Sequence, residues 1–247
     1  MTYRRDSDFH FVHGQFSKVS SPYKERELDR MLMAKTKTAV AFISHCTIQS
    51  RRLEYIRKLR KYGVDVDIYG KCGTLKCNSG LNRSEELKAA WNVSPNLKMT
   101  KDCFNVLDSR YKFYLSFENS LCDDYVSEKS LHLVLRHNIV PIIRDASNHS
   151  LFHPPKSYLD TKDFKNVESL ANHIKKLSRN FREYKKYFHW KKYYTVETVS
   201  AVLQSNLCQI CERLHNQHKY QRVYRDIVGF LLSRGDNSPI CHQPSDL

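Results

Sequence analysis

The pattern of apolar and polar residues predicts four β-strands and a helix between the first two of them. Residues 38–44 (TAVAFIS) and 139–143 (IVPII) are continuous apolar runs of the length typical of strands buried on both faces. Residues 64–69 (VDVDIY) and 111–117 (YKFYLSF) instead alternate, which predicts strands with one buried face. An amphipathic stripe over 50–62 lies between the first two strands in chain order and predicts a helix.

A second strand–helix–strand unit is expected around residues 111–143. Ser127 is a residue type favoured at helix N-caps, and apolar residues at helical spacing follow it. We therefore expect a helix over 127–137, between the strands at 111–117 and 139–143. Two such units in succession predict an α/β fold with a Rossmann-like, doubly wound parallel sheet.

The remaining segments divide the chain into an arm, a domain and a tail. Residues 1–37 are expected to form an N-terminal arm or linker with a short helix near 25–33, and residues 38–215 the Rossmann-like domain. The clearest helix covers 167–177, where apolar residues recur at i, i+3, i+4, i+7 and i+10. Residues 216–247 are predicted to be a basic, frayed tail.

The charge of the chain is strongly positive. Forty-one Lys and Arg against 26 Asp and Glu give a formal net charge of +15 over 247 residues. These positive residues are spread along the chain and no nucleic-acid motif accompanies them, which favours a solvated basic surface over a nucleic-acid site. A basic cleft for a diphosphate or contact with an anionic membrane would use the same charge. No run is long enough to span a membrane, and residues 1–20 are too polar for a signal peptide.

Polar side chains gather where the strand over 111–117 ends. Residues 118–125 (ENSLCDDY) carry three carboxylates, an amide, a serine and a tyrosine. In an open α/β sheet, ligands bind outside the carboxyl ends of the strands, and a helix N-terminus at that edge favours anions. The sequence therefore predicts a functional site at this turn.

The same stretch carries a family resemblance. Residues 111–129, YKFYLSFENSLCDDYVSEK, closely resemble the signature YKFYLxFENSxxxDYxTEK of the α-1,3-fucosyltransferases. Ser127 stands where Thr is usual and keeps a hydroxyl at the expected N-cap. Further segments are similar to family elements: 3–8 to YRxDSD, 139–164 to VPVVxGxxNYxxxxPPxSFIxxxDF, 187–192 to YFxWRK, and 208–211 to a C-terminal CxxC.

Two departures from the family pattern fall near the signature. Arg144 and Asp145 replace a glycine-bearing turn after a strand. Residues 130–133 (SLHL) replace the usual Leu-Trp/Tyr-x-Asn/Ala, which is expected to alter the packing beneath the donor site.

The resemblance implies the C-terminal, GDP-fucose-binding half of a two-domain GT-B glycosyltransferase. The implied activity is an inverting, GDP-fucose-dependent α-1,3-fucosyltransferase that acts on a GlcNAc hydroxyl of an N-glycan or related glycan on a glycoprotein. No cofactor is expected to be required, with a divalent cation at most stimulatory, and the implied location is the Golgi lumen or cisterna membrane. The family's catalytic glutamate precedes the YRxDSD element, so the base and any membrane anchor are expected outside this chain. The alternative is a truncated or degenerate homologue that binds a nucleotide sugar or a partner protein without catalysis.

The resemblance also implies the donor-binding residues. Arg52, through the family spacing S-x7-R-x2-Y, and Lys129 would stabilise the diphosphate leaving group, with Arg51 as a competitor for the first role. Glu128 would accept the ribose hydroxyls. The complete donor-binding set is Arg52, Asn119, Tyr125, Glu128 and Lys129. No aspartate pair follows a strand in a way that predicts a metal site.

Eight cysteines and three glycosylation sequons, at Asn82, Asn92 and Asn148, are consistent with an oxidising lumen. Cys208 and Cys211 form a CxxC pair that favours a disulfide, with a zinc site completed by Cys241 and His242, or a redox pair, as alternatives. Cys72, Cys77 and Cys103 are candidates for further bridges, in a loop-rich segment with a possible helix near 85–91.

Overall fold

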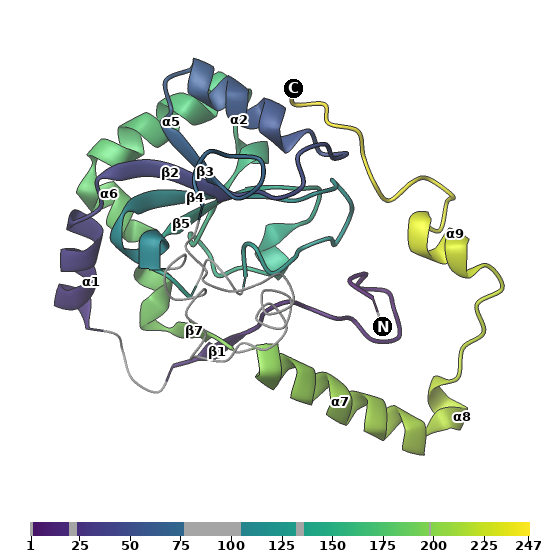
Figure 1. Ribbon diagram of the computed structural model, residues 1–247. Helices are drawn as coiled ribbons and strands as arrows, with labels where there is room; N and C mark the ends of the chain where they lie inside the picture. The colour runs from purple at the N-terminus through teal and green to yellow at the C-terminus, as the bar shows by residue number, and fades with distance from the viewer. Residues whose placement is uncertain (1, 20–23, 77–104, 132–135, 198) are drawn as a thin grey trace.

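The computed structural model describes residues 2–19, 24–76, 105–131, 136–197 and 199–247 (Figure 1). Several sequence-based expectations lie outside the described residues: the helix near 85–91, the sequons at Asn82 and Asn92, and the bridges of Cys77 and Cys103.

A five-stranded parallel sheet forms the centre of the molecule and confirms the predicted α/β class. Its strands are β2 (Lys37–Phe42), β3 (Val66–Tyr69), β4 (Tyr111–Phe117), β5 (Val140–Arg144) and β6 (Leu159–Asp160). They lie in the order β3-β2-β4-β5-β6, and all four pairings are parallel. The chain moves to one side from β2 to β3 and to the other side from β4 onward. The order therefore reverses between β2 and β4, and ligands bind at this switch point in doubly wound sheets.

Helices cover one face of the sheet. These are α1 (Glu25–Met33), α2 (Arg52–Lys61), α5 (Val167–Arg179) and α6 (Phe181–Lys186), and all four contribute to one hydrophobic core with β2, β4 and β5 (Figure 1). α5 begins at a capping box made by Asn166 and Ser169. Four of its five buried apolar residues are Val, Leu or Ile, and each of these contributes about 1.5–3 kcal/mol of transfer free energy to that core.

Strand β4 is buried on both faces, which differs from the single buried face expected from its alternating pattern. Phe113, Leu115 and Phe117 enter the helix-covered core, and Tyr111 and Tyr114 enter a second cluster on the other side. The tyrosine rings make the second face sufficiently apolar. Tyr111 satisfies its hydroxyl by donating to a carboxylate oxygen of Asp67, at 2.6 Å.

The helix expected over 127–137 is wrong for the described part of that range. Residues 128–131 form a turn. The reason is local: the Ser127 hydroxyl and amide both donate to a Glu118 carboxylate oxygen, which holds the chain in a compact loop. Lys129 therefore does not lie in the first turn of a helix.

Both ends of the chain return to the sheet domain. In the arm, β1 (Phe16–Lys18) pairs antiparallel with β7 (Tyr194–Val196), and the short helix expected near 25–33 is confirmed as α1. After α7 (Val199–His215), α8 (Gln217–Tyr220) and α9 (Ile227–Leu232), the last residues run back toward α2 and α5 (Figure 1). The tail is fixed by a Cys122–Cys241 disulfide and by Leu247 packing on the core, so it is not frayed. Among the described helices, none combines the length and apolar character that crossing a bilayer requires.

Candidate donor-binding site

Two loops meet at the switch point of the sheet. One follows β2 and leads into α2, and the other follows β4. Ser50 joins them, because its amide donates to the Asn119 carbonyl at 3.0 Å and its hydroxyl to the Glu118 carbonyl at 2.6 Å. Arg51 takes a left-handed backbone conformation, φ 49°, where this loop turns into the helix. Ser50 is fully buried, so the two loops form one continuous surface at the carboxyl edge.

Arg52 lies at this edge and is only 3% exposed. Its Nη1 donates to the Phe117 carbonyl at 3.0 Å and to Asn119 Oδ1 at 2.9 Å, and its Nη2 donates to the His45 carbonyl at 3.3 Å. Its Nε is buried and has no partner. Among the described residues no carboxylate pairs with this guanidinium. Burial lowers the pKa of Arg52, although the group stays charged at neutral pH.

Arg51, the competing cation, lies elsewhere. Its side chain is 54% exposed and forms an ion pair with Glu54 on the outer side of α2, at 2.6 Å. The structure therefore brings Arg52 and not Arg51 to the edge of the sheet.

Lys129 lies in the second loop and is bound to Glu118. Its Nζ is 2.9 Å from Glu118 Oε2, and the side chains of the pair are 15% and 1% exposed. The other carboxylate oxygen, Oε1, accepts from the Ser127 amide at 2.9 Å and from the Ser127 hydroxyl at 2.6 Å. Burial lowers the pKa of Lys129, but Glu118 and Glu128 more than compensate, so its pKa is raised.

Glu118 is the residue that the sequence reasoning missed as part of the site. It appeared there only as one of several polar residues in the turn. The sequence does contain a signal for this role: Glu118 directly follows a strand predicted to be buried, and Lys129, eleven residues later, needs a counter-ion. A buried charge without a partner is costly, so such a carboxylate requires a cation and hydrogen-bond donors close by.

Tyr125 and Glu128 complete the predicted set. Glu128 Oε1 lies 3.6 Å from Lys129 Nζ, and its side chain is 44% exposed, which leaves carboxylate surface available to a ligand. Tyr125 packs edge-on against Tyr3 of the N-terminal arm, with ring centroids 5.1 Å apart. Burial raises the pKa of Tyr125, and the negative charge of Glu118 raises it further, so its hydroxyl remains a donor at neutral pH.

The five predicted residues therefore lie around one edge. Asn119 touches Arg52 directly, and the remaining three follow in the same loop as Asn119. Arg52 and Lys129 also share two electrostatic neighbours, Glu118 and Tyr125. Chemically, the edge offers a buried guanidinium with neutral partners, an ammonium shared with carboxylates, and an exposed carboxylate suited to hydroxyl groups. Among the described residues no three His, Cys, Asp or Glu side chains are arranged to hold a metal ion.

The CxxC pair is not a disulfide. Cys208 and Cys211 are free and exposed on α7. Residues three apart on a regular helix hold their Cβ atoms about 5–6 Å apart, which exceeds the roughly 3.8 Å of a disulfide. The zinc alternative is also wrong, because Cys241 is bonded to Cys122. Cys72 does form a bridge, to Cys46.

The sequon asparagine that the structure describes, Asn148, is exposed before a 3-10 turn. Its Oδ1 accepts from the Ser150 amide at 3.2 Å and from the Ser150 hydroxyl at 2.8 Å. Its position at the surface leaves the asparagine accessible to a glycosylation enzyme.

A parallel sheet whose strand order reverses defines a doubly wound α/β domain, in which ligands bind outside the carboxyl ends of the strands. Comparison with known proteins narrows the class. The family model described as "Glycosyltransferase family 10 (fucosyltransferase) C-term" matches residues 32–230. The chain belongs to this family.

Two curated relatives that are more than 30% identical agree with that placement. Alpha-(1,3)-fucosyltransferase C of Drosophila melanogaster is 35% identical over 92% of this chain and 52% of its own length. Glycoprotein 3-alpha-L-fucosyltransferase A of the same organism is 32% identical over 92% of this chain and 41% of its own length. A crystal structure of an α1,3-fucosyltransferase with GDP-fucose is 18% identical, with a TM-score of 0.48 over 82% of this chain and 56% of that chain. The chain thus spans about half the length of the curated relatives it matches.

Proposed function

We propose that this chain binds GDP-fucose at the carboxyl edge of its sheet and takes part in fucosyl transfer. The observation that carries the proposal is Arg52. It is a buried guanidinium at the topological switch point, with neutral oxygen partners and an unpartnered Nε. A fixed cation in a largely dehydrated site interacts strongly with a phosphate group.

In this proposal each residue acts on a different part of the donor. Arg52 and Lys129 stabilise the charge that builds on the GDP leaving group as the bond to fucose breaks. Glu128 accepts hydrogen bonds from the ribose hydroxyls, and Asn119 and Tyr125 contact the nucleotide. The acceptor is a GlcNAc hydroxyl of an N-glycan or related glycan on a glycoprotein. Its oxygen bonds to the anomeric carbon of fucose as the bond to GDP breaks, its proton passes to a general base, and the inversion gives an α-1,3 linkage.

We further propose that the reaction needs no bound metal and takes place in the Golgi lumen. The two described disulfides, Cys46–Cys72 and Cys122–Cys241, support an oxidising compartment, because such bonds are rare where glutathione keeps thiols reduced. Two cationic side chains at the edge can provide the charge stabilisation that a divalent cation supplies in other transferases.

Calorimetry with GDP tests the donor site. Arg52→Met removes the guanidinium, and we expect GDP affinity to fall about 10- to 100-fold, the range for losing hydrogen bonds to a charged group. Arg57→Met is the matched control, because Arg57 lies on the same helix and is exposed. Near-UV circular dichroism checks that both variants keep the fold. Absence of GDP binding in the unmodified protein contradicts the proposal.

Product formation separates the enzyme from a non-catalytic homologue. The protein is incubated with GDP-fucose and a glycan that ends in GlcNAc, with and without EDTA. The mass of the glycan is then measured by mass spectrometry. A mass increase of one fucose in both samples would show that this chain also supplies the general base that takes the proton of the acceptor hydroxyl. GDP binding without product would instead favour a binding protein, and product lost only with EDTA would contradict the metal-independent reaction.

A further inference from the structure

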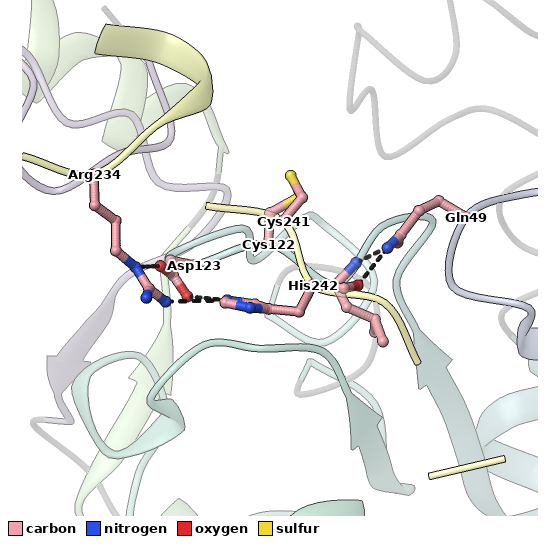
Figure 2. The surroundings of a disulfide bond; sticks show 7 residues. Gln49, Cys122, Asp123, Arg234, Cys241 and His242 are labelled. Carbon is pink, nitrogen blue, oxygen red and sulfur yellow. Dashed lines mark hydrogen bonds and ion pairs between the residues drawn. A yellow bond between two sulfur atoms is a disulfide. The ribbon is translucent and has the colours of Figure 1, made fainter. Parts of the chain in front are cut away.

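The last seven residues of the chain begin at a disulfide in the loop after β4, whose surroundings are shown in Figure 2. Cys241 is bonded to Cys122, three residues after Asn119. On either side of this disulfide the two segments pair as a short antiparallel bridge. The His242 amide donates to the Leu121 carbonyl at 2.7 Å, and the Asp123 amide donates to the Ile240 carbonyl at 2.8 Å.

The side chains around the disulfide strengthen this attachment. Figure 2 shows His242 and Arg234 converging on the Asp123 carboxylate. His242 Nε2 lies 2.8 Å from Asp123 Oδ1, and Arg234 Nε lies 2.7 Å from Asp123 Oδ2. The attachment thus consists of one covalent bond, two backbone hydrogen bonds and a carboxylate shared by two basic side chains.

The same tail also binds the loop that carries Arg52. Gln49, three residues before Arg52, donates its side-chain amide to the His242 carbonyl. Its Oε1 accepts from the Leu121 amide at 2.9 Å, so Gln49 bridges the tail to the loop after β4 (Figure 2).

The end of the tail is linked to the loop after β2 through Arg144 of strand β5. Both carboxylate oxygens of Asp246 accept from Arg144, at 2.6 Å each. Arg144 is 1% exposed and donates its Nη1 to the Ser50 carbonyl, also at 2.6 Å. Ser50 is the residue that joins the two site loops, and Leu247 then packs on the core.

We propose that residues 241–247 are a positioning strap for the donor site. The strap fixes the loop that carries Arg52 relative to the loop that carries Asn119 and Lys129, and so keeps the two cations in a constant arrangement for the proposed diphosphate. It touches both loops at residues next to the donor residues and not at the donor residues themselves. This inference rests on the proposed donor site for its consequence, while the mechanical coupling of the loops stands on the contacts alone.

Two measurements on the full chain test the strap. The strap variant is Cys122→Ser/Cys241→Ser, and its control is Cys208→Ser/Cys211→Ser, which removes two exposed free thiols from α7. Hydrogen exchange is followed in residues 44–52 and 118–131, with helix α5 as the reference for the fold. GDP affinity is measured by calorimetry on the same samples.

We expect the strap variant to exchange faster in both loops while α5 is unchanged. We also expect it to bind GDP about tenfold more weakly, as when the competent loop arrangement falls to a tenth. The control should match the unmodified protein. Unchanged exchange in the loops overturns the strap. Faster exchange throughout the sheet, or faster loops with unchanged GDP affinity, also overturns the positioning role.

A second variant covers failure of the first one to fold. Asp246→Asn removes the carboxylate from Arg144 and leaves the disulfide. Asp236→Asn is its control, because Asp236 is exposed and accepts hydrogen bonds from Ser238, two residues further along the chain. Faster exchange in residues 44–52 is expected for Asp246→Asn alone, and equal exchange in the two variants overturns the contact. If the unmodified protein does not bind GDP, the proposed function fails, and the exchange data still decide whether the strap holds the loops.

Discussion

The buried ion pair of Glu118 and Lys129 makes a quantitative prediction for the substitution Glu118→Gln. The glutamine has nearly the same size, so no cavity forms. Its amide group, however, is a donor that must face Lys129 or Ser127, which also donate to this position. The substitution therefore leaves the ammonium of Lys129 unpaired by Glu118 and at least one donor without an acceptor.

The expected cost follows from the burial of the pair. Removing one partner of a buried ion pair costs about 3–5 kcal/mol, because the remaining charge stays desolvated. Lys129 keeps 15% of its side-chain surface and a second carboxylate, Glu128, at 3.6 Å. Both relieve part of the cost, so we expect a loss of about 3 kcal/mol, the lower end of that range.

Urea unfolding measures this loss. With a slope of about 2–3 kcal/mol per molar urea, the midpoint should fall by about 1 M or slightly more. Glu54→Gln is the matched control, because Glu54 pairs with Arg51 at the surface of α2 and such pairs contribute less than about 1 kcal/mol. A Glu118→Gln midpoint as close to the unmodified protein as that of Glu54→Gln would refute the reasoning, since the pair would then behave as a solvated one.

Three further predictions concern stability. Burial lowers the pKa of His153 well below 6.5, so the unfolded state binds more protons than the folded state in acid. The free energy of unfolding should therefore fall by up to about 1.4 kcal/mol per pH unit below pH 6.5. Urea midpoints at pH 7.5 and 5.5 should differ less in His153→Leu than in the unmodified protein. Ile142→Ala, in the fully buried centre of β5, should cost about 2–5 kcal/mol by urea unfolding, against less than about 0.5 kcal/mol for the 60% exposed Val228→Ala. Cys208→Ser/Cys211→Ser should change the unfolding free energy by less than about 0.5 kcal/mol, whereas a stabilising disulfide would be worth more.

Local pattern was sufficient to predict most of the sheet domain. The strands at β2, β4 and β5 and the helices α1, α2 and α5 each occupy a segment whose periodicity identifies it. Periodicity works there because these elements bury one stripe or one run of apolar side chains against the same core. The parallel order of β2 and β3 followed from the helix between them, whereas β4 and β5 are parallel although the described residues between them form turns.

Periodicity failed at residues 127–131, where long-range contacts decide the conformation. A serine before apolar residues at helical spacing resembles a helix start, but the Ser127 hydroxyl and amide bind Glu118, nine residues earlier. A buried carboxylate competes more strongly for these donors than a helix would, because charge-assisted hydrogen bonds are stronger than neutral ones. Only the position of Glu118 in the folded chain reveals that competition.

The tail could not be predicted from its composition. A polar and basic segment normally stays solvated, yet residues 241–247 are fixed by partners more than 90 residues away in sequence. Cys122 and Cys241 are separated by 119 residues, and Arg144 and Asp246 by 102. Disulfide connectivity and paired charges at such separations leave no periodic signal in the sequence.

The high net charge of the chain does not come from the charged residues of the proposed donor site. The formal charges of Arg52, Lys129, Glu118 and Glu128 sum to zero, so the excess of +15 lies elsewhere on the molecule. Affinity for a diphosphate at this edge must therefore come from directed bonds and not from a broad positive field. Arg52 is suited to that role, because burial weakens solvent screening around its guanidinium and its Nε has no competing acceptor. Lys129 can turn to a phosphate only by sharing its ammonium with Glu118, which makes the geometry of the two loops, and hence the strap that holds them, decisive for binding.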